Sequence, residues 1–249
     1  MNYLRGLSRV QRRLGQRLIE SIADDGKQYL AIQVKGCRGT LYFPRNVPVG
    51  ALLITLPEQL YSWHWHYYQI PQTRVHPDDT VFDCGSAEGA FAFVNQHLGC
   101  RIHAFEPLPA FVDGLKRTFA ENPKVEVVSA ALAEKPGLAY LHEEGMSSFL
   151  TAEKTGKQVA VESIDHYCFE RHIPLSYLKA DLEGFEMSML RGAAESIRTY
   201  KPRIAITTYH KPEDPVEISR WLKKIHPGYR MLLKGVNRTH GNPVMLHAW

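Results

Sequence analysis

The sequence predicts an α/β protein whose central sheet is mostly parallel and ends in an antiparallel hairpin. From Thr80 onward, short apolar runs alternate with helical patterns, which is typical of β-α-β units. Two further apolar runs near the C-terminus are separated by a turn-rich segment. The residues before Thr80 show a different pattern, a helical stripe followed by a hairpin. We therefore expect a seven-stranded sheet with a small N-terminal addition.

The parallel strands are expected at the five short apolar runs, Thr80–Cys84, Arg101–Phe105, Val125–Ala130, Tyr177–Ala180 and Arg203–Thr207. Helical patterns follow four of these strands, at Gly89–Leu98, at Pro109–Glu121, at Phe185–Tyr200 and from Asp214 onward. The Asp-Pro pair at Asp214 supplies an N-cap and a first-turn proline. Strands near Tyr229–Leu233 and Pro243–Ala248 complete the sheet as the hairpin.

The N-terminal residues 1–75 are expected to form a helix-and-hairpin cap, and residues 76–249 the main domain. An apolar stripe at helical spacing, which we expect to pack on the main domain, consists of Leu4, Leu7, Val10, Leu14, Leu18 and Ile22. Two β-patterned runs, Tyr29–Val34 and Thr40–Phe43, flank a glycine-containing turn and predict the hairpin.

Composition is that of an ordinary globular protein, with 44% hydrophobic and 22% charged residues. No apolar run approaches the roughly 20 residues of a transmembrane helix, and the N-terminal arginines precede no secretory-type apolar block. The four cysteines show no C-x-x-C pair and predict reduced thiols. These features predict a cytoplasmic protein, and they leave the oligomeric state open, with a homodimer as one option.

The net charge of +4 is concentrated in residues 1–75, which hold ten Lys/Arg against four Asp/Glu. Such an excess can serve binding to nucleic acid or to an anionic surface. Arginines that lie off the apolar stripe are also explained as the solvated side of a helix, which is the interpretation that we adopt. We therefore expect no nucleic-acid partner.

The ends of the predicted strands carry the candidate site residues, because ligands of such sheets bind at the carboxyl ends of the strands. After the first strand comes D-x-G-x-x-x-G, formed by Asp83, Gly85 and Gly89, which allows the backbone to approach a ligand closely. Glu106 follows the second strand, 21 residues beyond Gly85, where an acid can accept both hydroxyls of an adenosine ribose. A helix N-terminal acid is the plainer explanation of Glu106 alone.

Three carboxylates within six residues, Asp181, Glu183 and Glu186, follow the fourth strand, and His210 follows the fifth. Neighbouring carboxylates can raise a proton affinity for base catalysis or gather a divalent cation. Helix capping is the alternative explanation of single acids of this kind. We favour a functional role, because Gly184 also permits a close approach of the backbone. A histidine of near-neutral pKa at the same sheet edge favours a functional cluster. We assign no residue to a metal, while a divalent cation stays open.

The aromatic run Trp63–Tyr68 precedes the first parallel strand. Aromatic packing between the cap and the main domain is its expected use, with a covering or sugar-stacking role as the alternative.

With these motifs together, the chain resembles the FkbM family of S-adenosylmethionine-dependent methyltransferases over residues 75–235. The resemblance rests on VFDCGSAEGAF, HAFEPLPAF, VESIDHY and, most specifically, YLKADLEGFEMSMLRGA. It implies a class I methyltransferase Rossmann-like fold. Ser86, Ala87 and Glu88 depart from the family's usual D-x-G-A-N-x-G, so the cofactor fit in that loop can differ in detail.

The resemblance also implies residue roles. The cofactor-binding set would be Asp83, Gly85, Ser86, Ala87, Glu88 and Gly89 around the methionine part, Glu106 at the ribose, Ser129 and Ala130 at the adenine, and Asp181 near the amino group or the acceptor. The implied activity is O-methylation, with a small molecule or a saccharide as the acceptor. His210, Asp181 or Glu183 would serve as the base, or Mg²⁺ would lower the pKa of the hydroxyl.

Two other functions are compatible with parts of the sequence. A noncatalytic binding module could retain the fold as a scaffold and use the basic cap for contacts. A dinucleotide oxidoreductase is disfavoured, because the loop lacks the G-x-G-x-x-G spacing that cradles a pyrophosphate.

Overall fold

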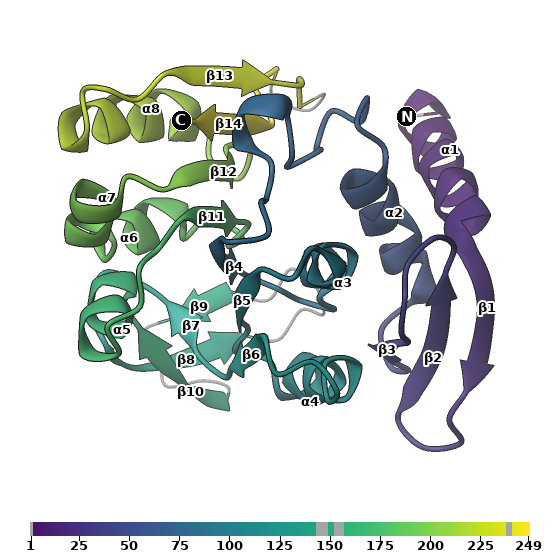
Figure 1. Ribbon diagram of the computed structural model, residues 1–249. Coiled ribbons are helices and arrows are strands. Elements are labelled where there is room, and N and C mark those ends of the chain that lie inside the picture. Colours follow the sequence, from purple (N-terminus) through teal and green to yellow (C-terminus); the bar gives the residue numbers. More distant parts are fainter. Residues whose placement is uncertain (1, 143–148, 152–156, 238–240) are drawn as a thin grey trace.

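The computed structural model describes residues 2–142, 149–151, 157–237 and 241–249, without side-chain placement for residues 2–8, 141–142 and 149–151. Its centre is a seven-stranded sheet of order β13-β14-β12-β11-β4-β5-β6 (Figure 1). The strands β12, β11, β4, β5 and β6 run parallel, and β14 runs antiparallel to both β12 and β13. The predicted fold class is confirmed.

Four of the five predicted parallel strands have the expected bounds, β4 at Thr80–Cys84, β5 at Arg101–Phe105, β11 at Tyr177–Ala180 and β12 at Arg203–Thr207. The strand β6 spans Val125–Val128 and ends two residues earlier than predicted. The hairpin consists of β13 at Met231–Lys234 and β14 at Met245–Ala248. Every residue of β4 and β11 is buried, because helices cover both faces of a parallel sheet.

The helix predicted from Asp214 onward is α8 at Asp214–Ile225. The helix α4 at Pro109–Thr118 begins where predicted and ends three residues earlier, and α3 at Ala90–Asn95 is shorter than predicted at both ends. The single helix predicted over Phe185–Tyr200 is wrong, because the segment forms two helices, α6 at Glu186–Arg191 and α7 at Ala194–Tyr200. They separate at Gly192, where a Cβ atom would lie 2.3 Å from the Ala133 carbonyl oxygen. Asp214 is also not the N-cap, which is Glu213.

A second sheet that the sequence did not predict lies beside β6. It contains β7 at Ala131–Leu132, β8 at Gly137–His142, β9 at Phe149–Thr151 and β10 at Lys157–Glu162, in the order β7-β10-β8-β9. The helix α5 at Ile164–Glu170 follows it and begins at the N-cap Ser163. In Figure 1 this sheet lies at the lower left, to the left of β5 and β6.

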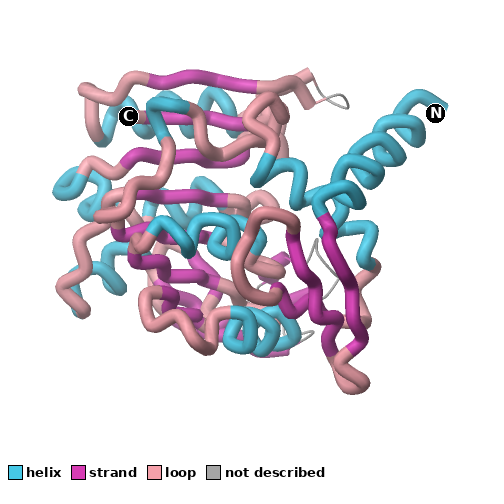
Figure 2. The backbone as a smooth tube through the Cα atoms, turned by 45° about the vertical axis from the view of Figure 1, so that its right-hand side comes forward, coloured by secondary structure: helices cyan, strands magenta, loops and turns pink. Residues whose placement is uncertain are grey.

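The N-terminal part forms helix α1 at Asn2–Leu18, strands β1 at Ile19–Asp24, β2 at Tyr29–Val34 and β3 at Leu41–Pro44, and helix α2 at Val49–Leu60. The predicted hairpin is β2 and β3, and β1 adds a third strand. Figure 2 shows α1 projecting from the rest of the chain.

The expectation for the apolar stripe was wrong in one respect, because Ile22 belongs to β1 and not to the helix. The helix α1 packs mainly on α2, and Leu18 at its end packs against the core that the cap shares with the sheet domain. Gly15 allows the contact of α1 with α2, since a Cβ there would lie 2.0 Å from the Leu53 carbonyl oxygen. Val10 is exposed, and the side chains of Leu4 and Leu7 lie outside the described residues.

Two hydrophobic cores lie on the two faces of the sheet. One joins α3, α4 and the cap, so that Leu52 and Leu56 of α2 share a cluster with Phe91 and Phe93 of α3. The other lies under helices α5 to α8. Since the first core contains residues of both parts, the cap is fixed against the sheet and does not stand apart from it.

All four cysteines are free thiols. Within the described part of the chain, no helix combines the length and the hydropathy that crossing a bilayer requires.

Candidate active site

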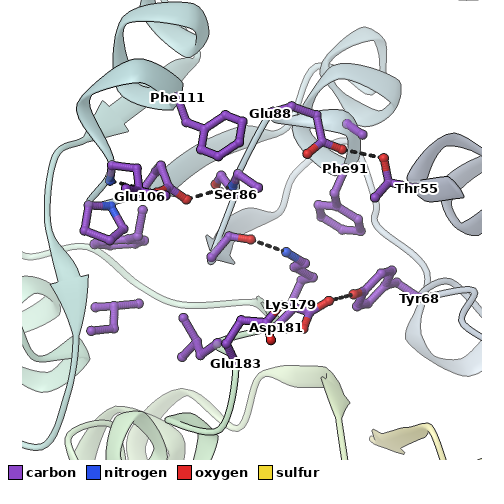
Figure 3. Close-up of a pocket in the computed structure, with 18 of the residues that line it drawn as sticks. Thr55, Tyr68, Ser86, Glu88, Phe91, Glu106, Phe111, Lys179, Asp181 and Glu183 are labelled. Carbon is purple, nitrogen blue, oxygen red and sulfur yellow. Dashed lines mark hydrogen bonds between the residues drawn. The ribbon is translucent and has the colours of Figure 1, made fainter. Parts of the chain in front are cut away.

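A cavity of about 280 Å³ opens at the carboxyl ends of the parallel strands. The turns after β4, β5, β6, β11 and β12 contribute its walls, and α2 with the segment after it closes one side (Figure 3). The site residues therefore come from the sheet edge that the sequence indicated, together with the cap. Of the predicted cofactor residues, those lining the cavity are Gly85, Ser86, Ala87, Glu88, Glu106, Ala130 and Asp181.

The turn after β4 is held in a conformation that its residues make possible. Gly85 has a φ of 74°, and a Cβ there would lie 2.0 Å from the carbonyl oxygen of Asp181. The Ser86 hydroxyl donates to the carbonyl of Asp83 at 2.9 Å, and Ala87 adopts a φ of 46°. Gly89 lies behind the wall against Leu115. The turn thus brings its backbone to the cavity surface.

Glu106 is fixed by two backbone amides. Ala87 N–H donates to Oε2 at 2.9 Å and Leu108 N–H donates to Oε1 at 2.8 Å. Each carboxylate oxygen can accept two hydrogen bonds and here accepts one from the backbone, so both oxygens retain a lone pair for a ligand in the cavity. Burial raises the pKa of Glu106 to about 7, against the lowering effect of the two amides. An oriented acid at this place fits the two hydroxyls of a ribose.

The wall beyond Glu106 is apolar and is formed by Pro107, Leu108, Phe111, Ala130 and Leu132. This surface fits a flat aromatic base. Ser129, which was expected beside Ala130, is exposed and is not among the lining residues.

Glu88 is a buried acid at the cavity wall. Its Oε1 accepts from the Thr55 hydroxyl at 2.5 Å, and its Oε2 has no hydrogen-bond partner among the described residues. Burial raises the pKa of Glu88. An acceptor without a donor at a cavity wall fits the ammonium group of a bound ligand.

Asp83 lies beneath the turn and not in the wall. Its Oδ1 pairs with the ammonium of Lys179 at 2.9 Å, and Lys179 also donates to the Gly85 carbonyl at 2.6 Å. Burial alone would lower the pKa of Lys179, but the charges of Asp83 and Asp181 outweigh it, so the pKa is raised. The pair holds β4, β11 and the glycine turn together.

Asp181 is the centre of the polar end of the cavity. Its Oδ2 accepts from the Tyr68 hydroxyl at 2.7 Å and lies 3.7 Å from His66, while its Oδ1 faces His210 at 3.6 Å. Burial would raise the pKa of Asp181, yet the histidines and Lys179 outweigh it and lower the pKa.

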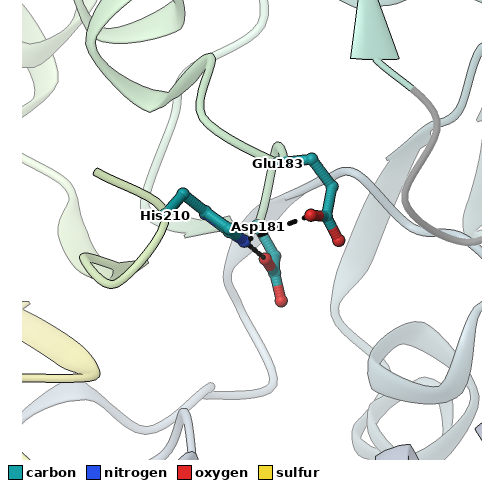
Figure 4. Close-up of side chains that lie close together, drawn as sticks. All are labelled: Asp181, Glu183 and His210. Atoms are coloured by element: carbon teal, nitrogen blue, oxygen red, sulfur yellow. Dashed lines mark ion pairs between the residues drawn. The ribbon is translucent and has the colours of Figure 1, made fainter. Parts of the chain in front are cut away.

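Glu183 stands beside this group at the cavity wall. It has a φ of 50°, and its Oε2 lies 3.5 Å from His210 Nε2 (Figure 4). Burial and the neighbouring Asp181 raise the pKa of Glu183 to about 7. We call Asp181, Glu183 and His210 the acid–histidine cluster.

Glu186 orients the histidine of this cluster. It is fully buried at the start of α6, and its Oε1 contacts His210 Nδ1 at 2.8 Å while accepting from Leu182 N–H and from the Thr207 hydroxyl. Burial would lower the pKa of His210, but the hydrogen bond to Glu186 and the charges of Asp181 and Glu183 raise it to about 9. The near-neutral pKa expected for His210 is therefore wrong.

The cap contributes to the cavity through part of the aromatic run, whose covering role was expected only as an alternative, and through Glu58, which was not predicted. His66 is buried with its Nδ1 3.0 Å from Glu58 Oε1, and both residues line the cavity with Tyr68. Trp63 and Trp65 of the same aromatic run are exposed. The alternation of buried and exposed residues in this run could have separated the two sets, but no residue pattern pointed to Glu58.

A glycine turn, an acid after the next strand and an acidic fourth strand end, on a sheet of this order, are the arrangement of a class I methyltransferase Rossmann-like fold. A family model described as the methyltransferase FkbM domain matches residues 83–231. The chain belongs to this family of S-adenosylmethionine-dependent methyltransferases. The resemblance inferred from the motifs is thereby confirmed.

Solved structures share the fold. The crystal structure of a methyltransferase FkbM from Methylobacillus flagellatus KT is 20% identical with a TM-score of 0.55, and the match covers 96% of this chain and 58% of that one. The chain thus spans 58% of the length of that relative. No curated protein matches the sequence.

Two weaker structural matches have TM-scores of 0.45, too low to support a functional argument. They are SMU.1697c from Streptococcus mutans in complex with SAH, 11% identical over 71% of this chain and 90% of that one, and Aeropyrum pernix fibrillarin with natively bound S-adenosyl-L-methionine, 12% identical over 93% and 99%.

Proposed function

We propose that this protein transfers the methyl group of S-adenosylmethionine to a hydroxyl oxygen of a small molecule or saccharide. The observation that carries the proposal is that one cavity is lined both by the residues that fit the cofactor and by two members of the acid–histidine cluster, Asp181 and Glu183. Polar groups concentrated at one end of a cavity suit an acceptor that presents a hydroxyl.

Cofactor binding is assigned to the glycine turn and its neighbours. Glu106 would accept the ribose hydroxyls, the apolar wall at Phe111 and Ala130 would hold the adenine, and Glu88 would accept from the amino group. Asp83 and Gly89 support the turn from behind, and the cap residues 1–75 would form the acceptor side of the cavity. Cytoplasmic location and a homodimer remain predictions.

The chain's own contribution to transfer is position and proton removal. When bound, S-adenosylmethionine supplies an electrophilic methyl: the C–S bond breaks with its electron pair left on sulfur as the acceptor oxygen forms the new C–O bond. Asp181, Glu183 and His210 would orient the acceptor hydroxyl, and its proton would pass to a group of this cluster or to water. Holding reactants in line can lower the barrier by about 7 to 11 kcal/mol.

Substitution within the cluster should separate catalysis from cofactor binding. We expect His210→Ala and Glu183→Gln to lower turnover by roughly 10² to 10⁴, because proton transfer contributes about that factor. The affinity for S-adenosylmethionine should stay within about twofold, since neither side chain touches the turn or Glu106. Turnover is measured by the transfer of a labelled methyl group to a panel of hydroxylated small molecules and saccharides. The affinity for S-adenosylmethionine is measured by calorimetry.

A matched control is His166→Ala, which removes a surface histidine that also contacts a glutamate, Glu162, at 2.8 Å. It should leave turnover unchanged. Unchanged turnover in the cluster variants would remove the cluster from the mechanism, and cofactor binding without transfer to any hydroxyl would favour a scaffold role.

Cofactor affinity should also depend on pH through Glu106. With its pKa raised to about 7, the side chain is ionised above that pH and accepts both ribose hydroxyls, whereas below it a proton occupies one oxygen. Affinity is therefore highest above pH 7 and should fall about tenfold between pH 8 and pH 6, in proportion to the ionised fraction. Glu106→Gln should bind more weakly without this pH dependence, and calorimetry at three pH values compares the two proteins.

A further inference from the structure

We propose that Asp181, Glu183 and His210 bind a divalent cation that ligates the acceptor hydroxyl. The inference rests on the proposed function and deepens it, because it states what the acid–histidine cluster does. The three side chains each offer one ligand atom, and these atoms lie within 4.8 Å of one another. Figure 4 shows the Nε2 atom of His210 directed toward both carboxylates.

The histidine is prepared as a ligand. Its side chain is 9% exposed, its Nδ1 contacts Glu186 at 2.8 Å, and its Nε2 has no hydrogen-bond partner among the described residues. A carboxylate that accepts the Nδ1–H of an imidazole fixes the ring, so that Nε2 can bind a cation once its proton is displaced, which is the usual arrangement behind a metal-bound histidine. Glu186 is thus a positioning residue for the cation site.

The two carboxylates have the charge and the spacing that a cation needs. Asp181 Oδ2 accepts from Tyr68. Its Oδ1 accepts a long hydrogen bond of 3.3 Å from the Thr207 hydroxyl, keeps a second lone pair and lies 3.6 Å from His210 Nε2, and Glu183 Oε2 lies 3.5 Å from the same nitrogen. Neighbouring ligand atoms of an octahedral cation with bonds of about 2.1 Å are roughly 3 Å apart, so small side-chain rotations bring the three atoms onto one ion. Binding of the cation displaces the Nε2 proton of His210 to solvent. Two carboxylates with the neutral imidazole that results then match a double positive charge.

The chemistry of the ligand set indicates the kind of cation. Two carboxylate oxygens and one imidazole nitrogen suit a borderline hard ion such as Mn²⁺, with Mg²⁺ as the close substitute. Three protein ligands leave coordination positions for water and substrate. Because Asp181 and Glu183 line the cavity, an acceptor hydroxyl can take one of these positions. The cation then lowers the pKa of that hydroxyl, and the released proton passes to water.

Binding of Mn²⁺ alone tests the site. The full chain, freed of metal by a chelator, is titrated with MnCl₂ while electron paramagnetic resonance reports the free ion. We expect one saturable site whose affinity falls at least tenfold in Glu183→Gln and in His210→Asn, and about tenfold to 100-fold in Glu186→Gln. His166→Asn, the surface counterpart that contacts Glu162, should bind Mn²⁺ as the unaltered chain does.

Calorimetry with S-adenosylmethionine on the same proteins separates this inference from the proposed function. Retained cofactor binding shows that a variant is folded, and Glu183 is a partly exposed residue whose replacement leaves the core intact. Absence of a saturable Mn²⁺ site, or equal Mn²⁺ affinity in the cluster variants and the unaltered chain, would overturn the cation site while leaving methyl transfer standing. If the unaltered chain does not bind S-adenosylmethionine, the proposed function is instead overturned.

Discussion

Glu106→Ala should reduce the affinity for S-adenosylmethionine about 100-fold or more. Hydrogen bonds to a charged group are worth about 1.5 to 3 kcal/mol each, and a loss of about 3 kcal/mol corresponds to roughly 100-fold in Kd. The change also leaves the amides of Ala87 and Leu108 without their acceptor, which loosens the turn that shapes the cavity. Calorimetric titration with S-adenosylmethionine and S-adenosylhomocysteine measures the effect.

The matched control is Glu121→Ala, because Glu121 is an exposed glutamate after α4 with no part in the cavity. Its affinity for both ligands should equal that of the unaltered chain. Tight binding by Glu106→Ala would exclude this side chain as the ribose acceptor and would require another placement of the cofactor.

Lys179→Met should lower the free energy of unfolding by about 3 to 5 kcal/mol, since it leaves the buried charge of Asp83 without its partner. Asp83 is fully buried, and among the described residues the ammonium of Lys179, 2.9 Å from Oδ1, is the group that balances its charge. Urea unfolding followed by circular dichroism gives the change.

The double variant Asp83→Leu with Lys179→Met provides the internal comparison. Removing both charges together should recover most of the lost stability, because a buried pair replaced by apolar side chains costs little. The surface pair Arg198–Glu195 serves as the control, and Arg198→Met should leave stability nearly unchanged. Equal stability of the single and double variants would show that the charge of Asp83 is compensated in another way.

The sequence predicted the main sheet well because each parallel strand is a short, fully buried apolar run, and burial on both faces leaves a local signal. The second sheet left none, since strands such as β10 are largely exposed and alternate weakly. The helix α2 was also not predicted, because Pro57 interrupts the helical pattern of its sequence.

The site residues that directly follow a strand could be predicted from the sequence, and most of those brought in by tertiary packing could not. Gly85, Glu106 and Asp181 follow strands directly, and the carboxyl ends of parallel strands share one edge of the sheet, so their positions in the sequence suffice to bring them together. Glu58 and His66 reach the cavity through packing of the cap against α3. The alternation of the aromatic run gives a local signal for His66, whereas no local pattern indicates Glu58. The pairing of Asp83 with Lys179 depends on β4 and β11 being neighbours in register, which requires the strand order.

The core that joins α2 to α3 bears on how ligands would exchange. If the cap swung away as a hinged lid, Leu52, Leu56, Phe91 and Phe93 would meet water, at a cost of about 1.5 to 3 kcal/mol for each side chain. Entry and exit are therefore expected at the mouth formed by the turns after the strands, with the cap stationary. Changes in cap residues such as Glu58 would then alter which acceptor fits, while the cofactor half stays the same.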